Sequence, residues 1–246
     1  MSANVVAIDG PAYVGKSVIA KALSQLTGYA VINTGHMYRA VARIAMEKGL
    51  TPADEHLILA CARGVRIGFQ RKDKEWLTMV NGEDWTHALD NGKIVLFSSK
   101  IACIAELRQM LTALQLEYAK SQTIIMEGRD IGSLVFPDAL WKFFITASLE
   151  VRAKRMCKMM QEDERRAHPD VNMLIPRIQE IDYADRNRKI APLIEAPDAI
   201  VYDNSDSPSG MQDALVLQYY IHHAQEIIRN VETLKKKGMV GSGKYR

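Results

Sequence analysis

A glycine-rich segment near the N-terminus constrains the fold of this 246-residue chain more than any other feature. Residues 10–17 read Gly-Pro-Ala-Tyr-Val-Gly-Lys-Ser and match the pattern G-x-x-x-x-G-K-[ST]. An apolar run at 4–8 predicts a buried strand before it, and apolar residues at helical spacing predict a helix at 17–26 after it. A glycine-rich turn between a strand and a helix points backbone N–H groups at a phosphate. The segment therefore predicts a nucleotide-binding loop, with a turn that holds no ligand as the less favoured alternative.

The loop implies a donor nucleotide and a metal ion. Lys16 is expected to reach the β and γ phosphate oxygens of ATP, and the Ser17 hydroxyl is expected to bind Mg²⁺. The residues expected to surround the phosphates are Gly10, Pro11, Ala12, Tyr13, Val14, Gly15, Lys16 and Ser17. GTPases, motor ATPases and small-molecule kinases share such a loop. The chain has no N-K-x-D tetrad and no long apolar strand ending in Asp-Glu, and it carries arginines in several separate segments, which favours a kinase.

Strands and helices alternate along the rest of the chain. The predicted strands of the main sheet are 4–8, 30–32, 123–126, 142–146 and 199–202, and the predicted helices are 17–26, 37–49, 51–63, 94–120, 149–161, 174–188 and 210–237. Short strands at 65–70 and 76–80, the turn signal Asn81-Gly82 and a strand at 83–86 predict a small antiparallel sheet. Alternating strands and helices on right-handed crossovers give a parallel sheet covered on both faces, which is a three-layer α/β fold.

Composition argues against several other classes of protein. The 32 Lys and Arg against 29 Asp and Glu give a net charge of +3, which is too weak to predict a nucleic-acid partner. The chain shows no leader sequence and no run of about eighteen apolar residues, so we expect no secretion and no membrane span. Cys61, Cys103 and Cys157 have no paired spacing, which argues against a disulfide framework or a zinc site. We expect a cytoplasmic monomer with no obligatory protein partner.

Five segments together resemble the bacterial-type cytidylate kinase (CMP/dCMP kinase) family of P-loop nucleoside monophosphate kinases. They are AIDGPAYVGKS, INTGHMYRAVA, VNGEDWT with SSKIA after it, EGRDIGSLVFPDA, and DRNRKIAPLIEAPDAIVYD. They span residues 7–203. The fourth segment is the most specific, because with the antiparallel insert it separates this family from adenylate, guanylate and shikimate kinases. The resemblance implies a P-loop NTPase fold that phosphorylates CMP and dCMP with ATP and Mg²⁺.

The resemblance also implies how a single domain at 1–237 is organised. It has a core, a nucleoside monophosphate (NMP)-binding segment, called the insert below, and a helical segment, called the lid. The expected boundaries are 1–35, 98–155 and 190–237 for the core, 36–97 for the insert and 156–189 for the lid. Residues 238–246 are expected to form a disordered tail.

The resemblance assigns acceptor and catalytic roles to residues in several segments. The acceptor-binding set is Thr34, Arg39, Ser99, Arg108, Arg129, Asp130, Asp185 and Arg188, and the catalytic set is Lys16, Arg129 and Arg188. Arg152 and Arg155 share one helix face and are expected to cover the ATP phosphates. Simpler interpretations stay open. Ser99 also fits a helix N-cap, and Arg129 with Asp130 also fits an ion pair. Arg152 and Arg155 also fit a solvated helix end.

The chain departs from the family pattern near the expected phosphate positions. The departures are Tyr13 and Val14 in place of small loop residues, Asn33 in place of an acidic residue, and Ile181 in place of a lid arginine. Arg177, one helical turn earlier, and Arg186 are candidate replacements for that arginine. These departures leave two alternatives to CMP phosphorylation. One is a related kinase with another pyrimidine monophosphate acceptor such as UMP, and the other is a nucleotide-binding regulatory protein with weak or no turnover.

Overall fold

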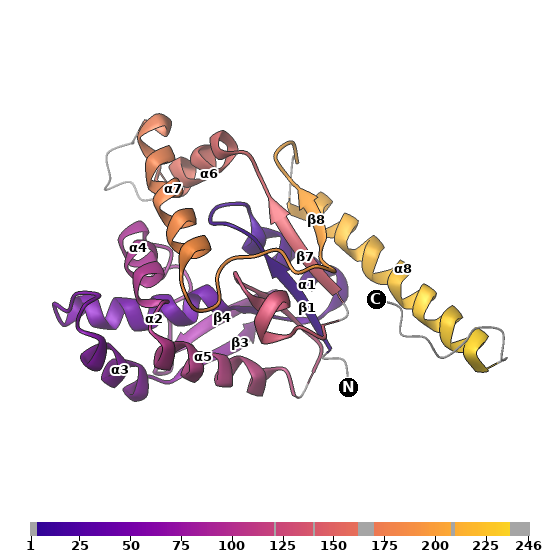
Figure 1. Cartoon of the computed structure of the whole chain (residues 1–246), viewed down its shortest axis with the longest axis horizontal. Coiled ribbons are helices and arrows are strands. Elements are labelled where there is room, and N and C mark those ends of the chain that lie inside the picture. Colours follow the sequence, from indigo (N-terminus) through magenta and orange to yellow (C-terminus); the bar gives the residue numbers. More distant parts are fainter. Residues whose placement is uncertain (1–3, 121, 140, 162–169, 208–209, 237–246) are drawn as a thin grey trace.

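The computed structural model describes residues 4–120, 122–139, 141–161, 170–207 and 210–236. Figure 1 shows a central sheet with helices around it, a group of helices at one end, and a long C-terminal helix that extends from the other end. The predicted tail at 238–246 and part of the lid, 162–169, lie outside the described residues. Within the described ranges, no helix is both long enough and apolar enough to cross a membrane.

Five parallel strands form the main sheet. They are β1 (Val5–Asp9), β2 (Ala30–Asn33), β6 (Ile124–Glu127), β7 (Trp141–Thr146) and β8 (Ile200–Asp203). Their order is β2-β6-β1-β7-β8, so β1 lies at the centre of the sheet. The loop at 10–17 follows β1 and therefore lies at the middle of the carboxyl edge, where α/β proteins bind their ligands. The predicted three-layer α/β fold with a parallel central sheet is confirmed.

The two faces of the main sheet are covered by different elements. α1 (Lys16–Thr27) and α8 (Gly210–Lys236) lie against one face. The π-helical turn η1 (Ile131–Val135) lies against the other face. Val6 and Ile8 of β1 pack in the core formed with α1 and α8, whereas Val5 and Ala7 pack in the core formed with η1. Successive strand residues point to opposite faces, so burial on both faces explains the continuous apolar run that predicted β1.

The insert shares a second apolar core, beside the main sheet, with residues 101–111. Its elements are α2 (Thr34–Glu47), α3 (Glu55–Gly64), β3 (Ile67–Lys72), β4 (Glu75–Val80) and β5 (Glu83–Asp84). The strands make a small antiparallel sheet, and Asn81 and Gly82 have φ of 53° and 91°, as a type I′ turn requires. β5 is shorter than the predicted strand at 83–86. The reason is that the hydroxyl of Thr86, rather than its backbone, accepts the N–H of Thr78 at 2.9 Å.

The prediction of a single helix at 94–120 is wrong. The chain instead forms α4 (Gly92–Ile101) and α5 (Ala105–Tyr118). The residue just before α5 is extended, with ψ of 112°, and the carbonyl of Ala102 accepts the Nη1 N–H of Arg108 at 3.1 Å. The break therefore exposes a carbonyl to a buried guanidinium that needs hydrogen-bond acceptors. The spacing of apolar residues in the sequence does not reveal this hydrogen bond, so it does not predict the break between the two helices.

α6 (Leu149–Gln161) and α7 (Val171–Asn187) pack against each other, and the expected lid, 156–189, comprises the end of α6 and all of α7. The buried residues of their shared core, called the lid core below, are Ala153, Met156, Cys157, Leu174 and Ile178. α7 also contacts α4, and Figure 1 shows the two helices beside each other. The lid is therefore in contact with the end of the insert in this structure.

A buried carboxylate joins β1 to η1. Asp9 is 4% exposed, and its two oxygens accept the backbone N–H groups of Ile131 and Gly132 at 2.9 and 2.7 Å. Burial raises the pKa of Asp9 to about 6, although both hydrogen bonds act to lower it. The sequence did not predict η1, because a five-residue turn held by a distant carboxylate has no periodic apolar pattern.

Replacing Asp9 with Asn tests this buried carboxylate. An acid whose pKa is higher in the folded state stabilises the fold while it is protonated. This contribution is full below the ordinary value of 3.8 and is lost as the pH rises through about 6. The free energy of unfolding of the wild type should therefore rise by about 1 kcal/mol relative to Asp9→Asn between about pH 7.5 and about pH 5. Urea unfolding at both pH values measures the difference, and a difference independent of pH would contradict the prediction.

Candidate active site

The loop at 10–17 is held in a conformation that depends on glycine. A Cβ at Gly10, where φ is 146°, would lie 2.2 Å from the carbonyl oxygen of Ile145. Lys16 is buried, and its Nζ donates to the carbonyls of Gly10 at 2.9 Å and Pro11 at 2.6 Å. Burial lowers the pKa of Lys16 well below its usual range. An anion bound in the loop would compensate the desolvated ammonium group.

The bulky loop residues Tyr13 and Val14 pack into apolar cores. Val14 is fully buried in the core formed with α1 and α8, and Tyr13 packs against the lid core. Tyr13 has φ of 61°, in the left-handed region that residues other than glycine rarely adopt. The departure at Tyr13 therefore connects the loop directly to the lid.

A small set of oxygen-bearing side chains lies where the loop meets α1. The hydroxyl of Ser17 donates to Glu127 Oε2 at 2.9 Å, and Asn33 Nδ2 lies 3.4 Å from the same hydroxyl. The hydroxyl of Thr34 donates to the carbonyl of Glu127 at 2.8 Å. Burial raises the pKa of Glu127. The hydroxyl of Ser17 and the carboxylate of Glu127 are oxygen ligands of the kind that Mg²⁺ prefers, and the Nδ2 of Asn33 is a hydrogen-bond donor beside them.

Arg152 and Arg155 contact the loop from α6 and are not a solvated helix end. Arg152 donates from Nε to the carbonyl of Ala12 at 2.7 Å, and its two Nη groups bind both oxygens of Asp182 at 2.7 Å. Arg155 Nη1 donates to the carbonyl of Val14 at 2.9 Å. Both guanidiniums therefore hold the backbone of the loop, and the pair with Asp182 ties that backbone to α7.

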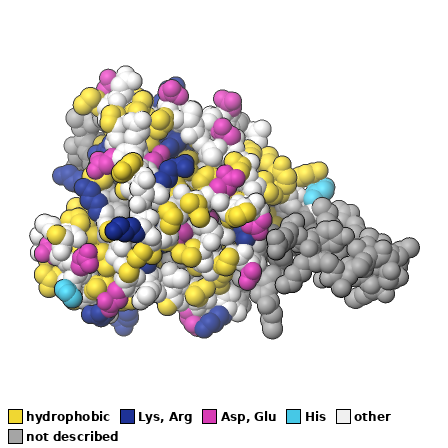
Figure 2. All heavy atoms as spheres, in the orientation of Figure 1, with side chains coloured by type: hydrophobic (Ala, Val, Ile, Leu, Met, Phe, Trp, Pro, Cys, Tyr) yellow, Lys and Arg dark blue, Asp and Glu magenta, His cyan; other side chains and the backbone are white. Residues whose placement is uncertain are grey.

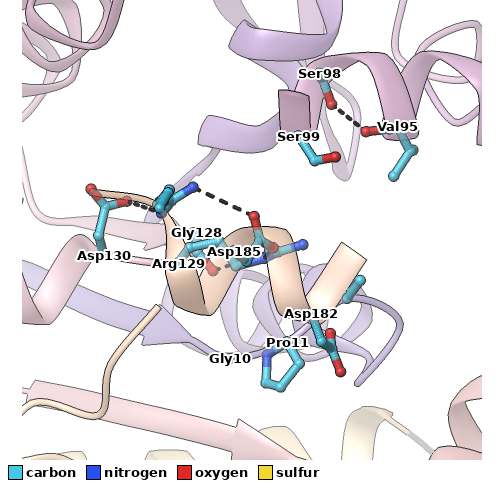
Figure 3. A network of polar contacts seen from close by, with 12 residues as sticks. Gly10, Pro11, Val95, Ser98, Ser99, Gly128, Arg129, Asp130, Asp182 and Asp185 are labelled. Atoms are coloured by element: carbon cyan, nitrogen blue, oxygen red, sulfur yellow. Dashed lines mark hydrogen bonds and ion pairs between the residues drawn. The ribbon is translucent and has the colours of Figure 1, made fainter. Parts of the chain in front are cut away.

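Three arginines and two aspartates alternate at the carboxyl edge of the sheet. Arg129 Nε donates to Asp185 at 2.8 Å, and Arg188 Nη1 lies 3.5 Å from the other oxygen of Asp185. Arg188 Nη2 lies 3.9 Å from Asp130, which also pairs with Arg108. Figure 3 shows Asp185 beside Arg129, with Asp130 on the other side of Arg129. These five residues, called the Arg–Asp chain below, all belong to the predicted acceptor set.

The Arg–Asp chain carries more positive than negative charge. Burial lowers the pKa of Arg188, and the charge of Arg108 adds to this effect. Burial acts on Arg129 in the same direction, but Asp185 outweighs it and raises the pKa of Arg129. Arg188 Nη2 is buried and has no hydrogen-bond partner among the described residues. A phosphate oxygen next to Arg188 would supply both the missing acceptor and the missing charge.

Arg39 lies on α2 and pairs with Asp90 at the end of the insert. Its Nε also donates to the carbonyl of Gly35 at 3.2 Å. His36 Nε2 lies 3.5 Å from Asp90, and His36 Nδ1 lies 2.7 Å from the hydroxyl of Thr78. Burial lowers the pKa of His36 to about 4. Burial acts to raise the pKa of Asp90, but His36 and Arg39 lower it to about 2. Asp90 is thus an anion that compensates Arg39.

Ser99 is not a helix N-cap. It lies in the last turn of α4, and its hydroxyl donates to the carbonyl of Leu96 at 2.9 Å. In the view of Figure 3, Ser98 and Ser99 lie on one side of the Arg–Asp chain, and Gly10 and Pro11 lie on the other. No bond joins Ser99 to that chain within the described residues.

Comparison with known proteins identifies the family. A sequence profile described as cytidylate kinase matches residues 6–218. The chain belongs to the cytidylate kinase family. A cytidylate kinase of Clostridium botulinum (strain Loch Maree / Type A3) is 39% identical over 201 residues, which cover 82% of this chain and 90% of that protein. A cytidylate kinase of Streptococcus mutans serotype c is 37% identical over 225 residues, which cover 91% and 96%. A solved gluconokinase from Sinorhizobium meliloti 1021 matches at 13% identity with a TM-score of 0.45, over 92% of this chain and 96% of that one.

The predicted departures in the lid can be located in the structure of this member of the cytidylate kinase family. Ile181 is 1% exposed, and Met156 is buried in the lid core. Arg186 is exposed on α7. Arg177 is half-buried, and its Nη2 donates to the carbonyl of Gly92 at 3.0 Å. Of the two candidate replacements, only Arg177 is directed towards the interior of the molecule.

Sequence reasoning missed several residues that support the site. Glu127 is the first residue of the segment EGRDIG. Its position directly after an apolar run is the signal from which it could have been predicted. Asp90 and Asp182 stand in no motif that we used, so their pairing with arginines is visible only in the structure. Asn204 also holds the loop, since its Nδ2 donates to the carbonyl of Val14 at 2.7 Å.

Removing Asp130 tests the Arg–Asp chain. Asp130→Ala leaves Arg108 buried without its carboxylate, so the free energy of unfolding should fall by about 3 kcal/mol. The exposed Asp206→Ala should change it by less than about 0.5 kcal/mol. Adding Arg108→Met to Asp130→Ala removes the unpaired charge and should recover part of the loss. Urea unfolding measures all three variants, and equal losses in Asp130→Ala and Asp206→Ala would rule the prediction out.

Proposed function

We propose that this protein transfers the γ-phosphoryl group of ATP to CMP and dCMP and produces ADP with CDP or dCDP. The observation that carries the proposal is the Arg–Asp chain, which lies at the same sheet edge as the phosphate loop in a chain of the cytidylate kinase family. A positively charged acceptor site beside a donor loop is the arrangement that phosphoryl transfer between two nucleotides needs.

The donor side of the site is assigned to the loop and α1. The backbone N–H groups of the loop and the N-terminus of α1 would bind the phosphates. Lys16 would exchange its hydrogen bonds to the carbonyls of Gly10 and Pro11 for bonds to phosphate oxygens. Arg152 and Arg155 are assigned to covering the ATP phosphates, and their contacts with loop carbonyls support this by holding both beside the loop. Preorganised donors of this kind stabilise charge that develops in the transition state without reorganising during the reaction.

A magnesium ion fits the oxygen donors beside the loop. Ser17 would bind it directly, and Glu127 and Asn33 would hold it through the hydroxyl of Ser17 or through its water ligands. The ion supplies neutralisation of the phosphate charge when it is bound. One carboxylate and one hydroxyl suit Mg²⁺, because this ion keeps several waters and takes its remaining ligands from phosphates.

The acceptor side is assigned to the insert and the Arg–Asp chain. Arg39 and Arg188 bind the acceptor phosphate, Asp185 binds the ribose, and Thr34 contacts the pyrimidine or its sugar. The carboxylate of Asp130 can accept the N4 amino group of cytosine, whereas uracil presents a carbonyl oxygen at that position. Asp130 thus favours CMP over UMP, and Arg108, Arg129 and Ser99 complete the contacts to base and phosphate.

The chemistry requires positioning more than acid–base catalysis. An oxygen of the acceptor phosphate attacks the γ-phosphorus, and the bond from that phosphorus to the β–γ bridging oxygen breaks as ADP leaves. Lys16, Arg129 and Arg188 stabilise the negative charge on the phosphoryl oxygens. No general base is assigned, because the attacking phosphate oxygen carries no proton when ionised.

The division into core, insert and lid, the cytoplasmic location and the monomeric state are part of this proposal. Lysine, arginine and acidic side chains are interspersed over the face in Figure 2, in keeping with small anionic substrates rather than a nucleic acid.

An ADP-release assay with Mg-ATP and each of CMP, dCMP, UMP and AMP tests the proposed function. We expect turnover with CMP and dCMP, and a kcat/KM about 10- to 100-fold lower with UMP because of the Asp130 carboxylate. Lys16→Ala should lower kcat by about 100-fold or more, since it removes the charge next to the transferred group. Preferred turnover of UMP would support a kinase with another acceptor. ATP and CMP binding without turnover would support a regulatory nucleotide binder.

Glu127→Gln tests the proposed metal site. Removing the carboxylate should raise the Mg²⁺ concentration for half-maximal activity by about tenfold, with a smaller change in ADP affinity measured without magnesium. Glu195→Gln, at an exposed position outside the site, is the control and should leave the Mg²⁺ dependence unchanged. The two variants should be compared in magnesium titrations at saturating ATP and CMP. An unchanged titration for Glu127→Gln would contradict the assignment.

A further inference from the structure

Arg177 differs from the other arginines of the site in its partners. Five of these arginines each lie within ion-pair distance of an aspartate, namely Arg39, Arg108, Arg129, Arg152 and Arg188. Arg177 has no carboxylate at that distance within the described parts of the chain. Its Nη2 donates to the carbonyl of Gly92 at 3.0 Å, and its Nε is buried with no hydrogen-bond partner among the described residues. A desolvated guanidinium with an unused donor is costly unless an anion satisfies it.

The position of Arg177 on α7 directs it towards the site. Arg177, Ile181 and Asp185 follow one another at intervals of four residues and therefore share one face of the helix. Asp185 on this face binds Arg129 at 2.8 Å, which shows that the face is turned to the Arg–Asp chain. Ile181, between the two polar residues, is buried and carries no charge. Arg177 is therefore the basic residue that this face of α7 presents within the described helix.

Arg177 also lies close to the donor loop. A small pocket between lid and insert is lined by Tyr13 of the loop, by Asp90 and Gly92, and by methionines of α6. Arg177 donates to the carbonyl of Gly92 at the rim of this pocket. Burial raises the pKa of Tyr13, and the charges of Arg39, Arg177 and Arg129 oppose that rise. The charges of guanidiniums from the insert, the lid and the end of β6 thus act on Tyr13.

We propose that Arg177 is the lid residue that binds the transferred phosphoryl group, exchanging its hydrogen bond to Gly92 for charge-assisted bonds to phosphate oxygens. This inference rests on the proposed function and extends it to a residue outside the acceptor and donor sets. The bond to a neutral carbonyl is weaker than a bond to a phosphate oxygen, so exchange is favourable when both nucleotides are bound. Closure of α7 over the loop would also exclude water from the reaction.

The test compares Arg177→Gln with Arg186→Gln on the same helix. Gln at 177 retains an N–H donor for the carbonyl of Gly92 but removes the charge, whereas Arg186 is exposed. We expect Arg177→Gln to lower kcat by about 100-fold or more, with KM for ATP and CMP changed by less than about threefold. Arg186→Gln should stay within about twofold of wild type. Arg177→Lys, which keeps the charge but not the planar fork, should recover part of the lost activity.

A binding measurement separates a role in catalysis from a role in holding the lid. The probe is ADP with aluminium fluoride and CMP, a mimic of the phosphoryl group in transfer. Arg177→Gln should bind ADP and CMP like wild type but bind the aluminium fluoride complex about 100-fold more weakly. An active wild type with an equally active Arg177→Gln would overturn the assignment of Arg177 alone. Loss in Arg186→Gln instead would assign the role to Arg186, and a wild type without CMP turnover would overturn both proposals.

Discussion

Two buried aspartates, Asp130 and Asp185, hold three arginines together at the carboxyl edge of the sheet, and the rest of the site depends on this contact. Three guanidiniums without carboxylates between them would repel one another in a region of low dielectric. Arg108 comes from α5, Arg129 from the end of β6 and Arg188 from the end of α7. The aspartates therefore join three segments that are far apart in the sequence, and they leave a net positive charge for an acceptor phosphate.

The donor loop contacts the lid as well as the sheet. Arg152 binds the carbonyl of Ala12 on one side and the carboxylate of Asp182 on the other, so it links the loop to α7. Tyr13 adds an apolar contact to the lid core, at a position where the family has a small residue. Both contacts join the loop to the two helices of the lid. The same packing of α7 places Arg177 beside Gly92, where its Nη2 donates to the carbonyl at 3.0 Å.

Local sequence patterns predicted most of the fold because its elements have strong local signals. The β1 strand is apolar on both faces, the loop after it needs glycine at position 10, and Asn81-Gly82 sets a type I′ turn. The failures share one physical cause. The turn η1 and the capped carbonyls of the loop depend on a side chain from a distant segment. The break between α4 and α5 depends on Arg108, which pairs with Asp130 beyond β6. Periodicity and propensity report only near neighbours along the chain.

The sequence by itself determined the α/β class, the phosphate loop and the family, because each depends on residue types at fixed spacings within short segments. The tertiary structure decided which charges face one another. Arg39 with Asp90, Arg152 with Asp182, and the position of Arg177 beside Gly92 join residues from different elements. Such pairs form only after the sheet has aligned the strand ends and the lid has packed on the loop. Long-range Coulomb interactions in a desolvated site depend on distance in space, which no pattern along the chain records.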